Sequence, residues 1–394
     1  MHFDQRSSNG ISRRTFLCSA ASVAALSGLS GIARATIPLK KNVLAYVACR
    51  QDGMGGDGAL EVFSLDGVRW TSIQRVPVSA PACVLLSPNQ QTLYVANQIG
   101  SHGGLPRGTV EAFRIDPSSG HLALLSRQPL SLSATYPRHM ALSPNGKLLA
   151  VAADGGSIYN LLPISSDGRP DRPRGIFKQS DCALNTQLQI DTFHGRLLFD
   201  TNGNHLLSSG FGRDAMSTFA VGHSPNSRRM RQRTLEIDNA DAFVLHPDGS
   251  MLYLLHEAGS CLSCYRYDSA SGQVAEAIQR ISTPTQYGAS ISRRTIAVHP
   301  SGHMLYTTEA AHRRLQAWRI NSRTGLLSQA NHIEFDGTSG DEIIVSSNGQ
   351  ELFVFGGLRG SIHRMAVDDV TGELGSVEEV AMIRGARNMA FKML

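Results

Sequence analysis

Short apolar runs separated by turn-forming residues dominate the hydrophobic pattern of the chain. The recurring unit is an apolar run, a turn near Pro-Asn-Gly or Pro-Asp-Gly, and a second apolar run, as in LSPNGKLLAVA at residues 142–152. Asn-Gly and Asp-Gly accept the positive φ angles of tight hairpins, so each unit predicts two antiparallel strands. Six copies follow one another at intervals of about 50 residues, and they begin at Leu86, Leu142, Phe199, Leu245, Val298 and Val345.

A second turn signal lies within most copies, for example DPSSG at 116–120 and DSASG at 268–272. Each copy therefore contains about four short strands, which is the content of one β-propeller blade. The seventh copy is divided between the chain ends: residues 42–49 and 58–63 resemble its second and third strands, and residues 386–391 resemble its inner strand. We predict an all-β, seven-bladed β-propeller whose ring is closed by a C-terminal strand that completes the N-terminal blade. A pair of β-sandwiches or a solenoid is the alternative.

The first 35 residues have the features of an export signal. The run SRRTFL at residues 12–17 matches the twin-arginine pattern, and a weakly apolar stretch from Cys18 to Ile32 follows it. This stretch is too short and too polar to span a bilayer stably, and Ala33-Arg-Ala35 resembles an A-x-A cleavage site. We therefore predict a twin-arginine signal peptide at 1–35, a mature domain at 36–394 without a membrane span, and a periplasmic or secreted location reached through the twin-arginine export machinery.

Charge and cysteine content exclude several classes of protein. The formal net charge is +5, but the leader contains four Arg and one Asp, which leaves about +2 for the rest; such a balance predicts no nucleic-acid binding. Cys261 and Cys264 lie in a strand-like run, where positions i and i+3 face opposite sides, and no second pair completes a zinc site. The glycines at 53–58 precede a strand instead of the helix that a dinucleotide site needs. We identify no cofactor motif and name no metal-binding residue.

With these hairpins and outer turns, the chain resembles the seven-bladed lactonase family, which includes bacterial 6-phosphogluconolactonase and fungal carboxymuconate cyclase. The resemblance covers residues from about 42 to the end. It implies a catalytic His, Arg and Glu at the mouth of the central channel. His194 and Glu257 match the His and Glu positions, whereas Asp241 occupies the position of the Arg.

An Arg-to-Asp exchange reverses the charge where an oxyanion would be held. Arg138, Arg294 and Arg387 occupy comparable inner-strand positions in their own repeats, so one of them could supply the missing charge. The resemblance thus implies His194 and Glu257 as catalytic residues and Arg138, Asp241, Arg294 and Arg387 as substrate-binding residues.

Two functions remain open. The first is a lactonase that opens a sugar lactone, with Glu257 as general base and His194 as proton donor. The second is a non-catalytic periplasmic propeller that binds a small molecule or a protein at the channel mouth. Asp241 favours the second function, and His194 with Glu257 favours the first. In either case we expect a lactone or another sugar-derived molecule as the main small-molecule ligand.

Overall fold

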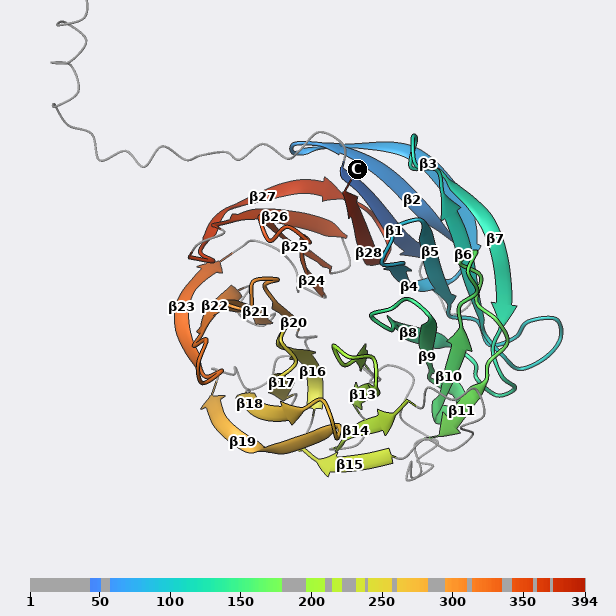
Figure 1. Cartoon of the computed structure of the whole chain (residues 1–394). Helices are drawn as coiled ribbons and strands as arrows, with labels where there is room; N and C mark the ends of the chain where they lie inside the picture. Colours follow the sequence, from blue (N-terminus) through green and yellow to red (C-terminus); the bar gives the residue numbers. More distant parts are fainter. Residues whose placement is uncertain are drawn as a thin grey trace, which may run out of the picture. The chain divides into compact units, whose positions relative to one another are not determined.

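A ring of seven antiparallel sheets builds the molecule, and each sheet has four strands. Figure 1 shows the sheets arranged as blades around a central opening. The computed structural model describes residues 43–50, 57–178, 196–209, 215–221, 232–237, 240–256, 261–282, 295–309, 314–334, 342–356, 360–368 and 371–393. The predicted seven-bladed propeller is therefore confirmed, and two sandwiches or a solenoid are excluded.

Each blade has the same order of strands from the channel to the rim, and blades are numbered here along the chain, with blade 1 containing the C-terminal strand. The inner strands of blades 1 to 7 are β28 (Ala386–Met393), β4 (Pro81–Leu86), β8 (Pro137–Leu142), β12 (Leu197–Phe199), β16 (Ala240–Leu245), β20 (Ile296–Val298) and β24 (Glu342–Val345). The second strands are β1 (Val43–Arg50), β5 (Thr92–Asn97), β9 (Leu148–Ala153), β13 (His205–Ser209), β17 (Met251–His256), β21 (Met304–Glu309) and β25 (Glu351–Gly356).

The two outer positions complete each blade. The third strands are β2 (Asp57–Asp66), β6 (Thr109–Ile115), β10 (Ile158–Pro163), β14 (Ala215–Ala220), β18 (Cys261–Asp268), β22 (Arg314–Ile320) and β26 (Ser361–Val367). The outer strands are β3 (Arg69–Ser79), β7 (Leu122–Pro129), β11 (Gly175–Lys178), β15 (Gln232–Glu236), β19 (Gln273–Ser282), β23 (Leu327–Glu334) and β27 (Leu374–Met382).

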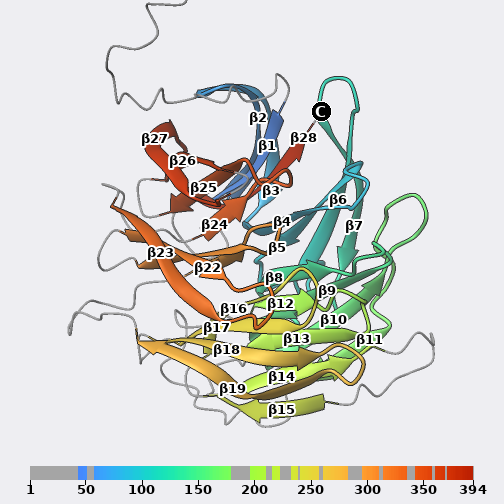
Figure 2. The same ribbon diagram turned by 60° about the vertical axis from the view of Figure 1, so that its left-hand side comes forward.

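Burial decreases from the second strand of a blade to its rim. Every residue of β5 and β17 is buried, because both faces of these strands pack against neighbouring blades. Such strands have continuous apolar runs, as parallel-sheet strands do for the same reason. The outer strand β19 alternates between exposed and half-buried residues instead, and Figure 2 shows β15, β19 and β23 at the periphery.

The ring closes through pairing of the two ends of the described chain. β28 pairs antiparallel with β1, from Val43 opposite Met393 to Cys49 opposite Ala386. Met389 is 3% exposed, and the Phe391 ring stacks on Phe353 of blade 7 with centroids 4.3 Å apart. The predicted closing strand is confirmed. Closure also pairs the inner edge of β1, which would otherwise expose unpaired backbone groups.

Tyrosines on the second strands connect neighbouring blades. In four cases the hydroxyl donates a hydrogen bond of 2.9–3.1 Å to a glycine carbonyl in the outer turn of the next blade: Tyr46 to Gly120, Tyr94 to Gly168, Tyr253 to Gly325 and Tyr306 to Gly372. These glycines have φ between +68° and +89°. A Cβ at Gly372 would lie 2.0 Å from the Met304 side chain of blade 6, so the turn needs glycine for its conformation and its close approach.

No helix in the part of the chain described here is long and apolar enough to cross a membrane. The predicted signal peptide at residues 1–35 lies outside the described residues.

Candidate functional site

Four inner strands contain a β-bulge close to the end at which they enter the channel. The pairing of each with its second strand skips one residue: Ala82 in β4, Arg138 in β8, Asp241 in β16 and Arg387 in β28. A bulge bends the strand and redirects the side chain of the extra residue, and bulges are frequent beside active sites. Three of the four bulged positions are residues that the sequence predicted as substrate-binding.

Arg138 is held at the channel mouth by a carboxylate from its own blade. Its Nε lies 3.0 Å from Oδ2 of Asp154, which follows the last residue of β9, and the two side chains are 25% and 20% exposed. Burial raises the pKa of Asp154 to about 6, and the Arg138 charge opposes this effect without cancelling it. The pair therefore couples a fixed cation with a carboxyl that changes charge near neutral pH.

In blade 5, two residues have the same separation along the chain as Arg138 and Asp154 in blade 3, but they are of different types. Asp154 follows the residue that pairs with Pro137, and Glu257 follows His256, which pairs with Ala240. Arg138 with Asp154 in blade 3 and Asp241 with Glu257 in blade 5 thus occupy equivalent positions. Blade 3 contains the Arg and carboxylate combination that the resemblance leads one to expect in blade 5.

The remaining predicted residues are only partly described. Arg387 is exposed at its bulge, and in the same blade Nη1 of Arg50 donates to Oε1 of Gln98 at 2.5 Å. The backbone of Asp241 is placed by β16, but its side chain lies outside what the structure describes, as do His194, Glu257 and Arg294. Whether these residues meet Arg138 at the channel mouth stays a prediction.

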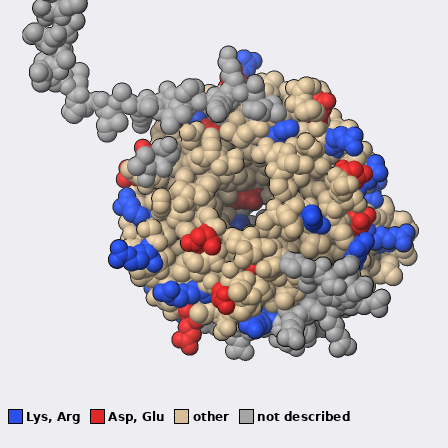
Figure 3. All heavy atoms as spheres, in the orientation of Figure 1, with Lys and Arg blue, Asp and Glu red and all other residues tan. Residues whose placement is uncertain are grey.

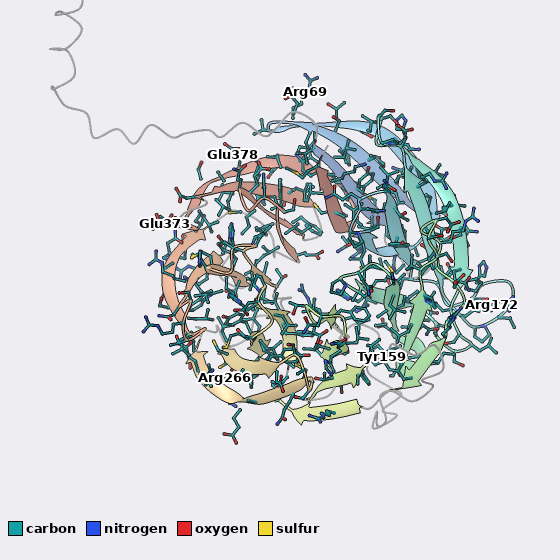
Figure 4. The ribbon with its side chains drawn as sticks, in the orientation of Figure 1. Arg69, Tyr159, Arg172, Arg266, Glu373 and Glu378 are labelled. Atoms are coloured by element: carbon teal, nitrogen blue, oxygen red, sulfur yellow. The ribbon has the colours of Figure 1, made fainter. Side chains whose placement is uncertain are left out.

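A belt of polar side chains lies one residue deeper than the bulges. Each blade contributes the residue that follows its bulge, or that follows the equivalent position of the sequence where no bulge is described, and we call this mostly polar set the polar belt. Its members are Asn388, Cys83, His139, Arg196, Ala242, Thr295 and Glu342, in blades 1 to 7 respectively. Figure 3 shows acidic and basic atoms inside the central opening. By contrast, the arginines and Glu373 labelled in Figure 4 point away from the channel.

Backbone hydrogen bonds between neighbouring blades hold the belt in place. The N–H of Val84 donates to Oδ1 of Asn388 at 2.7 Å. In the same way the N–H of Leu197 donates to Nδ1 of His139, and that of Ile343 to Oγ1 of Thr295. In each case the side chain accepts from the backbone N–H of the residue that follows the belt residue of the next blade. Oε2 of Glu342 accepts from Nδ2 of Asn388 at 2.6 Å, which links blades 7 and 1.

Arg196 crosses from blade 4 to blade 6. Its Nη2 donates to Oγ1 of Thr295 at 2.9 Å, and blade 5 lies between them with only the methyl group of Ala242 at the belt. Burial, with the Arg196 charge acting in the same direction, lowers the pKa of His139 to about 3. Burial, reinforced by the Glu342 carboxylate, raises the pKa of Cys83 to about 12. The belt therefore presents a neutral imidazole and a neutral thiol beside one guanidinium.

The chain matches the family described as "Lactonase, 7-bladed beta-propeller" over residues 45–391. It belongs to this lactonase family. Among curated proteins, 6-phosphogluconolactonase of Pectobacterium atrosepticum is 22% identical over 303 residues, which cover 76% of this chain and 84% of that protein. The enzyme of the same name from Bacillus subtilis is 20% identical and covers 65% of this chain and 71% of its own length.

Solved lactonase-like propellers have the same fold. A putative 6-phosphogluconolactonase from Bacteroides fragilis superposes with a TM-score of 0.73 at 19% identity, covering 90% of this chain and 99% of that one. The periplasmic gluconolactonase of Pseudomonas aeruginosa superposes with a TM-score of 0.74 at 18% identity, covering 89% and 99%. At these identities the structures show that the fold is shared.

Beyond the belt, this lactonase-family propeller has an apolar hollow. A cavity of about 440 Å³ lies among the inner strands of blades 2 to 5, and its walls include Leu85, Met140, Leu197 and Phe243. His139 and Arg196 also line this cavity. Within the described ranges, no group of three or more His, Cys, Asp or Glu side chains is arranged to hold a metal ion.

The polar belt and Asp154 were not predicted from the sequence. Aligning the six hairpins would have placed six of the seven belt residues at one level, because each of these lies at a fixed distance before its hairpin. The contact between Arg196 and Thr295 had no such signal, since 99 residues separate them.

Proposed function

We propose that this member of the lactonase family is an enzyme that opens the ring of a neutral sugar lactone. The observation that carries the proposal is the charged channel mouth of a family-matched propeller, where the inner-strand bulge of blade 3 holds Arg138 against Asp154. The curated relatives named 6-phosphogluconolactonase and the periplasmic gluconolactonase support ring opening of a sugar lactone as the reaction class.

The proposed mechanism assigns the chemistry to His194 and Glu257, the two residues that the family resemblance implies as catalytic. The Glu257 carboxylate removes a proton from water as the water adds to the lactone carbonyl carbon. A tetrahedral oxyanion forms, the bond from that carbon to the ring oxygen breaks, and His194 donates a proton to the ring oxygen. The proton that Glu257 took from water then replaces the one that His194 gave, which restores both residues. The product is a hydroxy acid, which ionises and releases one proton.

A neutral substrate agrees best with the charges of the chain. Asp241 stands where a cation would receive an anionic group, and a carboxylate there repels a phosphate. The predicted twin-arginine leader also supports a location outside the cytoplasm, whereas phosphorylated sugar lactones are made inside it. We therefore propose a periplasmic or secreted enzyme whose partner is an unphosphorylated sugar lactone.

The test is the rate of base consumption by the full chain in a pH-stat, with a panel of aldonolactones and muconolactones. We expect turnover above the spontaneous rate on at least one aldonolactone. Glu257→Gln keeps the size of the side chain and should lower kcat by about 10²- to 10⁴-fold, because it removes the general base. Glu276→Gln, an exchange on the exposed face of β19, is the matched control and should leave the rate unchanged.

No turnover by the wild-type chain on any lactone would contradict the proposal. Asp241 favours the second candidate in that case, a non-catalytic propeller that binds a small molecule or a protein at the same mouth. Calorimetric titration of the same lactones without turnover would identify such a binder.

A further inference from the structure

Lactone opening creates negative charge on the carbonyl oxygen and then a carboxylate, so the site needs a cation or strong hydrogen-bond donors. At the bulge of blade 5 the chain has Asp241, which provides neither. One residue deeper, the polar belt contains Arg196. The position and contacts of this arginine indicate where the negative charge is received.

Arg196 approaches blade 5 from its neighbour. It precedes β12 in blade 4, and its guanidinium reaches Thr295 in blade 6. The belt residue of blade 5, Ala242, is next to Asp241 in sequence and has only a methyl group. Thr295 is fully buried and also accepts the N–H of Ile343, which fixes the position of its hydroxyl.

His139 is a second donor beside this cation. Because Nδ1 of His139 accepts the N–H of Leu197, the proton of the neutral ring is on Nε2. Burial and the nearby Arg196 charge lower the pKa of His139 to about 3, so the ring stays a neutral donor at any pH at which the reaction would be measured. His139 and Arg196 line the same cavity of about 440 Å³.

The carboxylate of the belt is engaged elsewhere. Glu342 accepts from Asn388 across the junction of blades 7 and 1. Among the residues that the structure describes, no carboxylate lies within ion-pair distance of Arg196, whereas Arg138 is paired with Asp154. Arg196 is therefore better suited than Arg138 to bind an anionic group of a ligand.

We propose that Arg196 and His139 bind the oxyanion that forms during lactone opening and the carboxylate of the hydroxy-acid product. This inference rests on the proposed lactonase function and replaces the expected arginine at position 241 with one from the neighbouring blade. No additional reactant is required: Arg196 and His139 keep their protons and stabilise the charge as the carbonyl oxygen gains it.

The first experiment measures product binding in the absence of turnover. Sodium gluconate is titrated calorimetrically into the full chain and into Arg196→Met, which keeps most of the side-chain length and removes the charge. We expect gluconate to bind the wild-type chain and to bind the variant at least tenfold more weakly. Arg314→Met is the matched control, because Arg314 lies half-buried at the start of β22, a third strand, and pairs with Glu334; the affinity of this variant should equal that of wild type.

The second experiment measures kinetics on the best aldonolactone of the panel. Loss of one preorganised donor to an oxyanion typically lowers kcat by 10²- to 10³-fold, so Arg196→Met should lose about that factor. In Arg196→Ala, added guanidinium chloride should restore part of the rate, whereas sodium chloride at the same ionic strength should not. A purely structural role of Arg196 would give no such specific rescue.

Thr295→Val covers the case in which variants of Arg196 fail to fold. It removes the hydroxyl that anchors the guanidinium, keeps the charge, and should lower kcat by about tenfold, a partial loss of the same donor effect. Wild-type gluconate affinity and kcat in folded Arg196→Met, with activity abolished in Glu257→Gln, would overturn the inference and leave the lactonase function standing. Failure of the wild-type chain to bind gluconate would also overturn it.

Discussion

At the scale of single residues, Asp154 has the most unusual environment among the described groups of the channel mouth. Its carboxyl lies beside Arg138, yet burial raises its pKa from 3.8 to about 6. Between these two values the folded state keeps a proton that the unfolded state has released. The associated stability is therefore fully present below pH 3.8 and is lost as the pH rises through about 6.

Asp154→Asn should reverse this loss, because an amide has no charge to bury. Relative to wild type, the free energy of unfolding of the variant should rise between pH 4 and pH 8 by up to about 3 kcal/mol, the equivalent of the pKa shift. Urea denaturation at both pH values measures this difference. The pKa of about 6 already includes the attraction between Asp154 and Arg138, so the ion pair adds no separate contribution to this difference.

Asp248→Asn provides a control of opposite sign. Burial acts to raise the pKa of Asp248, but hydrogen bonds from Ser250 and a contact with His246 outweigh it and lower this pKa. The free energy of unfolding of Asp248→Asn should therefore fall, relative to that of wild type, as the pH rises from 3 to 8. Parallel pH dependences of the two variants would show that the Asp154 carboxyl is not held protonated by burial.

At the scale of elements, β28 determines whether the blades form a closed ring. It supplies the inner strand of blade 1 and carries the belt residue Asn388, which accepts from blade 2 and donates to blade 7. Without β28, the apolar residues of β1 lose the strand that covers their channel side. The same pairing aligns the bulge at Arg387 with the bulges of blades 2, 3 and 5.

Ending the chain after Gly385 should therefore prevent stable folding. We expect the truncated chain to lose its cooperative thermal transition, whereas Met389→Ala should retain the fold and lose about 2–5 kcal/mol through the cavity it creates. Circular dichroism during heating measures both. A truncated chain that melts cooperatively at the wild-type temperature would show that six complete blades and an open seventh are sufficient.

At the scale of the whole molecule, the closed ring is relevant to export. The twin-arginine route carries folded proteins, and the propeller is complete only when the last strand of the chain has paired with the first described one. We therefore propose that folding precedes translocation. The proposed export of a folded protein agrees with this architecture, because blade 1 combines β1, β2 and β3 with β28.

Replacing both Arg13 and Arg14 with Lys should retain the protein in the cytoplasm, because the twin pair is the recognised feature of the predicted leader. Cell fractionation followed by immunoblotting measures the distribution. Arg34→Lys, which changes an arginine of the same leader outside the pair, should leave export intact. Equal distribution of the wild-type chain and the double variant would contradict the twin-arginine prediction.

The sequence by itself determined the number of blades, their hairpins and the closing strand. These features depend on local chemistry that recurs in each copy: Asn-Gly and Asp-Gly turns, apolar runs of strand length, and the likeness of residues 386–391 to 137–142. It also placed Arg138, Asp241 and Arg387 at comparable positions, and the structure shows all three on bulges.

Only the tertiary structure decided which side chains meet. The pairing of Arg138 with Asp154, the polar belt, and the contact of Arg196 with Thr295 depend on how the strands curve around one channel. No local pattern encodes these contacts, because they join residues from different strands, and the contact of Arg196 with Thr295 joins blades that are not neighbours. For the belt, the physical cause is the closure of the ring, which brings one residue of every blade to the same level of the channel.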